Sequence, residues 1–420
     1  NTHPPCSGSV VMLKMGFCTK WTDIVMHCIS TVSFRIKVNG ELTRGFAPTR
    51  GLRQGDPLSP FLFILVADVF SNLIFRVASS NSLHGAKVCR VSPPVSYLFF
   101  ADDCLLFSRA TTNECRVIIQ AIQQYERASG QSINHGKSKI SFSAGVPPSK
   151  KEELCDYAGI QLVEKHQKYL GLPTVIGRSK KKIFESLMDR IEKKIQGWTP
   201  KKISKAGKEI LIKFVIQSIP GYFMSLFKLP STVVNLIHSR TANFWWGKND
   251  GRNRTHWIAW EKLCKPKSEG GMGFQNLFHF NDALLAKQGW RSINHPSSLC
   301  ARVLRAKYFP HKDFHVSSLG PRPSFLWRSI WGAQSLLEKG LGWRIGNDQT
   351  VNIWIDPWLI DEEGVRASSP ARPGFEDTSV GCLFSDQGLG WCLEKIHAWF
   401  NERDKRIILS TPWVPDAGSD

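Results

Sequence analysis

Hydrophobic and polar positions follow two periodicities in the first part of the chain, one typical of helices and one typical of strands. Between residues 11 and 30, apolar residues recur three or four positions apart, which predicts an amphipathic helix and its turn. Residues 32–38 alternate between apolar and polar side chains, and Asn39-Gly40 follows them. This combination predicts a half-buried strand, a tight turn and a return strand to about Phe46. A long apolar run then starts at Ser59-Pro60, where proline favours the beginning of a helix.

A second series of strands and helices surrounds two aspartates. The run YLFFADDCLLF, residues 97–107, has strand character on both sides of Asp102 and Asp103. It predicts a tight hairpin whose turn carries both carboxylates. Residues 113–128 predict a helix that Ser129-Gly130 ends. A strand pair at 139–143 and 168–172 is expected to close this α+β unit near residue 175.

The rest of the chain reads as mainly helical. From 180 to 240 the helical pattern is interrupted at Thr199-Pro200 and at Pro220-Gly221. Beyond residue 241 the composition changes, because 13 of the 15 tryptophans lie from Trp245 onward. This predicts a compact, aromatic-rich helical region, in which some rings could stack on bases and the others form the core. The expected divisions are 1–175, 176–240, 241–360 and 361–420.

Length and composition restrict the class of protein. A chain of 420 residues with 42% apolar content has room for two or three globular domains. No apolar run reaches 18 uninterrupted residues, and the start NTHPPCSGSV lacks the pattern of a signal peptide. We therefore predict an intracellular protein, in nucleus or cytoplasm, that is not secreted and contacts no membrane. Eleven scattered cysteines without a CxxC pair favour reduced thiols, and the missing initiator Met suggests a fragment.

The positive charge of the chain is concentrated in one block. The formal net charge is +20, and residues 165–213 contain 14 Lys/Arg against 4 Asp/Glu. From residue 361 onward the balance reverses, with 11 acidic against 6 basic residues. A concentrated basic block predicts a contact with a polyanion such as nucleic acid. No pattern points to a protein partner.

The aspartate pair carries the candidate chemistry. Adjacent carboxylates between buried strands would repel each other and resist ionisation unless a cation lies beside them. Mg²⁺ is the expected cation, because it binds carboxylate oxygens together with substrate phosphates. The alternative is a solvated Asp-Asp turn without a bound ion.

Four segments in order place the pair in a known family. They are GLRQGDPLSP at 51–60, FADD at 100–103, SGQSINHGKSKI at 129–140 and KYLGLP at 168–173. Together they resemble the palm of a reverse transcriptase, most closely those of plant non-LTR retrotransposons of the LINE type. The resemblance extends through the basic block into FWWGKNDGRNRTHWIAWEKLCKPKSEGGMGFQNL, residues 244–277.

The resemblance implies a fold and four parts. The fold class is α+β: a partial right-hand polymerase palm, an antiparallel sheet with helices, over 1–175. A basic helical thumb follows over 176–240, and a Trp-rich, mainly helical region over 241–360. Residues 361–420 would be an acidic linker and the start of a further domain.

The resemblance also implies a chemistry, which is two-metal phosphoryl transfer with two Mg²⁺ ions, an RNA template, a DNA primer and dNTPs. Asp102 would be the principal metal ligand and Asp103 would support it. Phe100 takes the aromatic position of the motif and Ala101 the variable one. Lys137, or alternatively Lys139, would donate a proton to pyrophosphate. Template and nucleotide would contact the loop residues Gly51, Arg53, Gln54 and Gly55, and the primer grip would be Tyr169, Leu170 and Gly171.

The chain departs from the family in one respect. The family's metal site needs a further carboxylate on a strand just before the helix that begins near Val10. The only acids before Asp102 are Asp23, Glu41, Asp56 and Asp68, and Asp56, followed by proline, is expected to cap the next helix. We therefore predict a truncated, inactive remnant of an RNA-directed DNA polymerase. The alternatives are a non-catalytic nucleic-acid-binding protein and a maturase-like RNA-binding factor.

Overall fold

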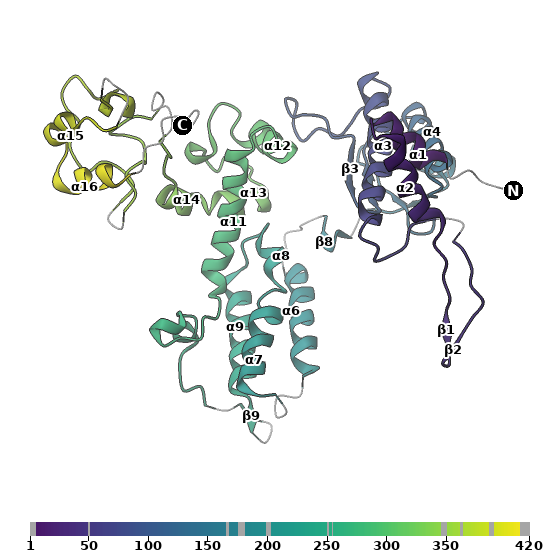
Figure 1. Cartoon of the computed structure of the whole chain (residues 1–420), viewed down its shortest axis with the longest axis horizontal. Helices are drawn as coiled ribbons and strands as arrows, with labels where there is room; N and C mark the ends of the chain where they lie inside the picture. The colour runs from purple at the N-terminus through teal and green to yellow at the C-terminus, as the bar shows by residue number, and fades with distance from the viewer. Residues whose placement is uncertain are drawn as a thin grey trace. The chain divides into compact units, whose positions relative to one another are not determined.

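The computed structural model forms two compact units, Asn1–Lys180 and Lys181–Asp420 (Figure 1). It describes residues 6–48, 51–164, 168–174, 181–198, 203–249, 252–253, 255–345, 351–361, 364–385 and 390–411. Small sheets accompany many helices, so the α+β class is confirmed. The finer divisions near residues 240 and 360 stay predictions.

The first unit begins with two helices and a projecting hairpin. The single helix predicted over 11–30 is wrong, because α1 (Cys6–Lys14) and α2 (Thr19–Ser30) are separated at Gly16, whose φ is +91°. Asn39 and Gly40 form the predicted turn, with φ values of 50° and 97°. The strands themselves are short: β1 (Lys37–Val38) pairs with β2 (Glu41–Leu42), and both are exposed. No third strand pairs with them among the residues that the structure describes, and alternation alone does not extend the ladder.

The aspartate hairpin packs on two long helices. Strand β3 (Tyr97–Phe100) pairs antiparallel with β4 (Asp103–Leu106), and Phe100 lies opposite Asp103. The two predicted helices are present as α3 (Ser59–Ser79) and α4 (Thr112–Ser129), and both pack against the hairpin. The side chain of Thr111 caps α4, and Gly130, with φ of 72°, ends it.

Aromatic rings hold this layer together. Phe70 of α3 stacks on Phe99 of β3 at 5.1 Å between ring centres and on Tyr125 of α4 at 4.7 Å. Ser71 Oγ donates to the Tyr97 hydroxyl at 2.7 Å. Each such buried side chain stabilises the unit by about 1.5–3 kcal/mol. The hairpin is therefore fixed through its inner face, and its outer face and turn are free to meet a ligand.

Helix α3 is strongly apolar although few of its residues are buried. Among the described residues it is the one helix long and apolar enough to cross a membrane, with a mean hydropathy of 2.0 over 18 residues, 11% of them buried. Phe61, Ile64 and Phe75 lie exposed along it. No uninterrupted apolar run of 18 residues marks this helix in the sequence, because Asp68, Ser71-Asn72 and Arg76 interrupt it.

The strand pairing predicted for residues 139–143 and 168–172 is wrong. Strand β5 (Lys139–Ile140) pairs in parallel with β6 (Gln161–Leu162), and α5 (Pro148–Ala158) connects them. A crossover helix returns the chain in the same direction, which parallel pairing requires. Strand β7 (Lys168–Tyr169) pairs instead with its neighbour β8 (Leu172–Pro173).

The second unit starts with the basic helices α6 (Lys181–Gln196) and α7 (Lys205–Leu211). A π-helical turn, Ile212–Ile216, continues α7, and the predicted break at Pro220-Gly221 precedes α8 (Gly221–Met224). The other break, at Thr199-Pro200, lies outside the described residues. The later elements are α9 (Ser231–Trp246), β9 (Lys248–Asn249), β10 (Arg252–Asn253), α10 (Trp260–Leu263), α11 (Leu277–Asn294), α12 (Leu299–Tyr308), α13 (Phe325–Trp331), α14 (Gln334–Gly340), α15 (Leu393–Trp399) and α16 (Glu402–Ser410).

Tryptophans form much of the core of this unit. Trp327 is fully buried and stacks on Tyr308 at 4.7 Å between ring centres. Trp245, Trp260 and Trp358 are also buried. These rings pack against protein, so they are not available to stack on bases; Trp257, which is 80% exposed, is available.

Candidate functional site

The two aspartates lie at the tip of the β3–β4 hairpin. Phe100 pairs with Asp103, so Ala101 and Asp102 form a two-residue loop. Ala101 adopts φ of 50°, a left-handed conformation that costs an L-residue roughly 1–2 kcal/mol. A small side chain reduces crowding in this loop, and such strain concentrates where a turn positions functional groups.

Both carboxylates are exposed to solvent. Among the described residues, neither accepts a hydrogen bond or forms an ion pair. Our expectation of a low-dielectric site between buried strands is therefore wrong, because only the inner face of the hairpin is covered. The solvated turn describes the surroundings of Asp102 and Asp103 correctly.

The thiol of Cys104 lies next to Asp102 and Asp103 in the sequence. Its thiol donates to the Asp102 carbonyl at 3.9 Å. Desolvation raises the pKa of the Cys104 thiol, and the charges of Asp103 and Asp102 raise it further. Burial is thus the larger cause of the raised Cys104 pKa, and the two neighbouring carboxylates act in the same direction.

The carboxylates fit one part of a metal site. Mg²⁺ commonly takes one or two protein carboxylates and completes its shell with water and substrate phosphates. However, no group of three His, Cys, Asp or Glu side chains in the described part of the chain could hold a metal ion. The third carboxylate missing from the sequence motif is thus not supplied there by another element. The pair alone does not fit a two-metal centre.

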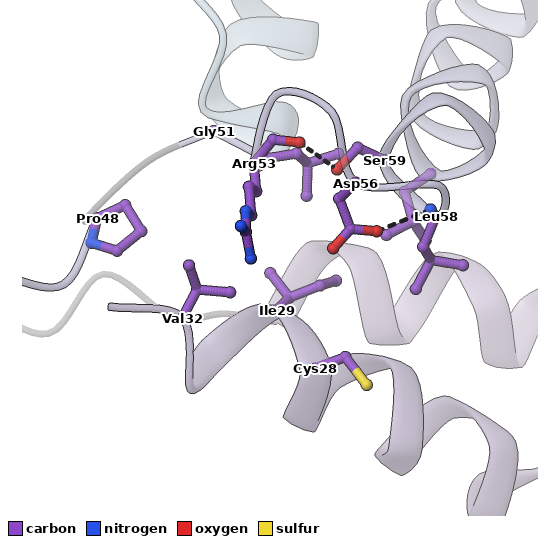
Figure 2. A pocket seen from close by; sticks show the side chains of 11 residues that line it. Cys28, Ile29, Val32, Pro48, Gly51, Arg53, Asp56, Leu58 and Ser59 are labelled. Carbon is purple, nitrogen blue, oxygen red and sulfur yellow. Dashed lines mark hydrogen bonds between the residues drawn. The ribbon is translucent and has the colours of Figure 1, made fainter. Parts of the chain in front are cut away.

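The loop after residue 50 lines a small pocket beside α2 and α3 (Figure 2). The pocket has about 350 Å³ of empty space, partly open to solvent. Its walls come from Cys28, Ile29, Val32, Pro48, Gly51, Leu52, Arg53, Asp56, Leu58, Ser59 and Leu62. Of the four loop residues predicted to contact template and nucleotide, Gly51 and Arg53 line this pocket, whereas Gln54 and Gly55 do not.

Hydrogen bonds hold the loop on the start of α3. Asp56 Oδ1 accepts from the Leu58 backbone N–H at 2.8 Å, which forms an Asx turn before the helix. The predicted capping role of Asp56 is wrong, because Leu58 is the N-cap residue of α3 and no side chain caps this helix. Ser59 Oγ donates to the Arg53 carbonyl at 2.8 Å. Gly51 and Gly55 have φ values of +80° and +89°, which a side chain would strain. Figure 2 shows the Arg53 side chain extending into the pocket, so a cation is presented next to an apolar wall.

The two candidate lysines differ in their contacts. The backbone N–H of Lys137 donates to Asn134 Oδ1 at 3.1 Å, and its side chain is exposed. The ammonium of Lys139 donates to the Gln161 side chain, across the β5–β6 pair. Lys139 thus has a local partner, whereas no ion pair involves Lys137 in the described residues.

The predicted primer-grip segment is a tight hairpin. Leu170 and Gly171 connect β7 to β8, with φ values of 49° and 78°. Two consecutive positive φ values are typical of a type I′ turn. Tyr169 precedes the turn and is half-buried. The structure thus places the predicted site residues on four local elements, and only those of the aspartate hairpin are adjacent by strand pairing.

Sequence reasoning missed a buried ionic cluster around Glu114 of α4. Glu114 is 6% exposed and accepts from the backbone N–H groups of His84 and Arg109 at 3.1 and 2.9 Å. Its other oxygen lies 2.8 Å from His84 Nδ1. Burial acts to raise the pKa of Glu114, but these hydrogen bonds and the nearby His84 outweigh it and lower that pKa. Thr111 and Glu114 have the spacing of a capping box, which was a usable signal.

Comparison with known proteins identifies the class. Residues 8–174 match the family model for reverse transcriptase (RNA-dependent DNA polymerase). The chain therefore contains a reverse transcriptase region, of the type encoded by non-LTR retrotransposons. The four segments that carried the resemblance all begin within the matched region.

The relatives are plant and retrotransposon proteins. An uncharacterised mitochondrial protein of Arabidopsis thaliana is 42% identical over 146 residues, 34% of this chain and 95% of that protein. A putative ribonuclease H protein of the same plant is 32% identical over 228 residues, 54% of this chain and 37% of that protein. A Pol polyprotein of the R2 retrotransposable element of Popillia japonica is 32% identical over 168 residues, 38% of this chain and 22% of that protein. The chain thus spans only a minor part of the last two.

Proposed function

We propose that the first unit is the palm of an RNA-directed DNA polymerase and that its aspartate hairpin is the metal-binding site. The observation that carries the proposal is the hairpin itself. Its inner face is fixed on α3 and α4, and its tip presents two exposed carboxylates that no described residue neutralises. A buried structural aspartate would be hydrogen-bonded to the protein. These two side chains are solvated, so a cation that arrives from solvent can reach both of them.

Each candidate residue has a role in this proposal. Asp102 is the principal ligand and Asp103 supports it, with Phe100 and Ala101 shaping the turn. Arg53 offers a positive charge to the phosphates or the template beside the nucleotide, and its loop is held by Ser59. Lys137 has an exposed ammonium that can give a proton to pyrophosphate.

The proposal includes inactivity of the isolated 420-residue polypeptide. Of the four acids before Asp102, Asp56 is engaged by the Leu58 N–H and Asp68 by the Asn72 amide. Glu41 lies on the exposed β1–β2 hairpin and Asp23 on α2. With only two carboxylates, charge on the reacting phosphates is left uncompensated, and such losses usually abolish turnover.

Primer extension on an RNA template tests the inactivity. We expect no DNA synthesis by this polypeptide alone with Mg²⁺ or Mn²⁺. Processive synthesis that the substitution Asp102→Ala abolishes would contradict this expectation while supporting the assignment of Asp102.

Cleavage by bound iron tests the site itself, whether or not turnover occurs. Fe²⁺ replaces Mg²⁺ and, with ascorbate and peroxide, cuts the backbone beside its ligands. We expect cuts near residues 100–104 in the presence of primer, template and dNTP. Asp102→Asn with Asp103→Asn should remove them, and Asp156→Asn, at an exposed acid on α5, should not. Cuts that persist in the double variant would refute the metal assignment.

A second candidate is a nucleic-acid-binding protein without catalysis, favoured by the basic block at 165–213. Its described parts include α6 and α7, a helical region that we propose as the thumb and that would contact phosphates without reading bases. Salt-dependent binding of RNA or DNA with neither incorporation nor iron cleavage at the hairpin would favour this candidate over the first.

A further inference from the structure

The second unit contains a groove that the polymerase motifs do not include. It lies between α11, α13 and α14 and encloses about 1140 Å³ of space that opens to solvent. Its lining residues are Lys228, His279, Asp282, Ala283, Arg328, Ser329, Gly332, Ala333, Ser335, Leu336 and Lys339. We refer to it as the α11–α14 groove.

The charge in the groove is positive. Asp282 is the one acid in the lining, and it forms an ion pair with Lys228. Arg328 and Lys339 are exposed, and neither forms an ion pair with any residue that the structure describes. Two full positive charges, one on α13 and one on α14, therefore face the same space without a counter-charge. His279 adds a third cation only when protonated.

The frame that holds these cations is rigid. Ser329, which is buried, accepts from the Lys228 backbone N–H at 2.9 Å. Asn281, also buried, accepts from the Leu229 N–H at 2.8 Å and donates to the Met224 carbonyl at 2.8 Å. These bonds tie the 224–229 segment to α11 and α13. The charged side chains are thus presented from fixed backbone positions, which lowers the entropic cost of binding.

The lining indicates the chemistry of the ligand. Arg328 and Lys339 suit phosphate oxygens, and Ser335 can donate a further hydrogen bond. Ala283, Gly332 and Ala333 are small, so a chain of linked phosphates can approach the wall. No Phe, Tyr or Trp lines the groove, and therefore the only ring in the lining on which a base could stack is the imidazole of His279.

We propose that the α11–α14 groove binds the phosphodiester backbone of a nucleic-acid strand, independently of base sequence. The proposal rests on the proposed function only for the identity of the polyanion. It adds a contact in the second unit to those of the polymerase hairpin and the basic block. Because phosphate contacts position a strand without reading it, the groove would hold template or product regardless of sequence.

The test measures binding of fluorescein-labelled 12-nucleotide oligo(U) to the whole chain, in EDTA and without dNTP, between 50 and 200 mM KCl. Loss of polymerase chemistry cannot change this result. Removing two single-strand phosphate contacts should reduce the steepness of log K plotted against log salt concentration by about 1.4. This change corresponds to roughly a 25-fold loss of affinity at 0.1 M salt. We expect this loss for Arg328→Gln with Lys339→Gln. Oligo(A) should bind as tightly as oligo(U).

The matched control is Arg302→Gln with Lys312→Gln. These two cations are exposed in the same unit, lie outside the groove, and form no ion pair in the described residues. The control should keep the wild-type slope, and both variants should melt at the wild-type temperature. Equal losses in both double variants, or no loss in the groove variant, would overturn the proposal.

Crosslinking locates the contact. Oligonucleotides that carry 4-thiouridine should crosslink to peptides that contain 279–283 or 328–339, and the groove variant should lose these crosslinks. Crosslinks confined to the first unit would contradict the proposal. So would displacement of the oligonucleotide by oligo-glutamate of equal charge, or by inorganic phosphate or dTTP at the oligonucleotide's own concentration. Displacement by oligo-glutamate would indicate an acidic peptide as the ligand. Displacement by inorganic phosphate or dTTP would indicate a single phosphate group.

Discussion

Asp404 and the pair at 102–103 are carboxylates in opposite surroundings, because Asp404 is enclosed by protein and the pair is exposed to solvent. Asp404 is fully buried in the second unit and accepts five hydrogen bonds. The donors are the backbone N–H and hydroxyl of Ser368, the same groups of Ser369, and the guanidinium of Arg403. Asp102 and Asp103 are exposed and accept none from the described residues.

The difference separates a structural carboxylate from one available to a ligand. The protein satisfies Asp404 completely, so this side chain has no capacity left for an ion or a substrate. The hairpin leaves both of its carboxylates to solvent, where a bound cation can exchange with water at little cost. Glu114, which is buried and accepts hydrogen bonds, is a structural carboxylate like Asp404.

The largest effect is expected from Asp404→Asn. The amide would turn two N–H donors toward a cluster that consists of donors, and Arg403 would lose part of its charge compensation. We expect a loss of about 3–5 kcal/mol in the free energy of unfolding of the region around Ser368 and Ser369. Hydrogen exchange of these two amides, followed by mass spectrometry, measures it. Unchanged protection of these two amides would mean that Asp404 does not stabilise the fold. The contrast between Asp404 and the exposed pair Asp102 and Asp103 would then be refuted.

A smaller loss is expected from Glu114→Gln, which weakens charge-assisted hydrogen bonds to His84 and Arg109. We expect about 1.5–3 kcal/mol, measured by urea unfolding at pH 7. Glu152→Gln, at an exposed acid on α5, is the control. Because folding lowers the pKa of Glu114, its contribution is present above the unfolded value of about 4.3 and is lost as pH falls through the folded value. The difference in the free energy of unfolding between the wild-type protein and Glu114→Gln should therefore shrink upon acidification. A difference that grows instead would contradict the lowered pKa of Glu114.

The smallest effect is expected at the hairpin tip. Asp103→Asn should leave the unfolding midpoint unchanged, because no described contact of its carboxylate is lost. It should lower the pKa of the Cys104 thiol, since the charge of Asp103 helps to raise that pKa. Alkylation of Cys104 by iodoacetamide as a function of pH, read by peptide mass spectrometry, measures the change. A thiol that titrates as in the wild type would show that the pair produces no field at this position.

Much of the local structure was predictable from the sequence. Asn39-Gly40 predicted a turn, Ser129-Gly130 the end of α4, and the run around Asp102 a tight hairpin. These features depend on residues a few positions apart, whose backbone preferences act locally. The prediction that the turn carries both carboxylates is wrong for Asp103, which is the first residue of strand β4 and pairs with Phe100. The helix of residues 11–30 was wrong because apolar spacing does not reveal a break at Gly16.

Long-range pairing and exposure were not predictable in this way. Strand β5 could have paired with several short strands, and the parallel partner β6 depends on how α5 returns the chain. The contacts of Glu114 with His84 and of Asp404 with Ser368 join residues 30 and 36 positions apart. No local pattern distinguishes such acids from Asp102.

The sequence by itself determined the family of this chain, because four motifs in order survive as strings of residues whatever surrounds them. It also determined the turns, where one or two residues decide the backbone angles. Only the tertiary structure decided which carboxylates are free. Burial depends on every element that packs nearby, and the same residue type is enclosed at position 404 and open to water at positions 102 and 103.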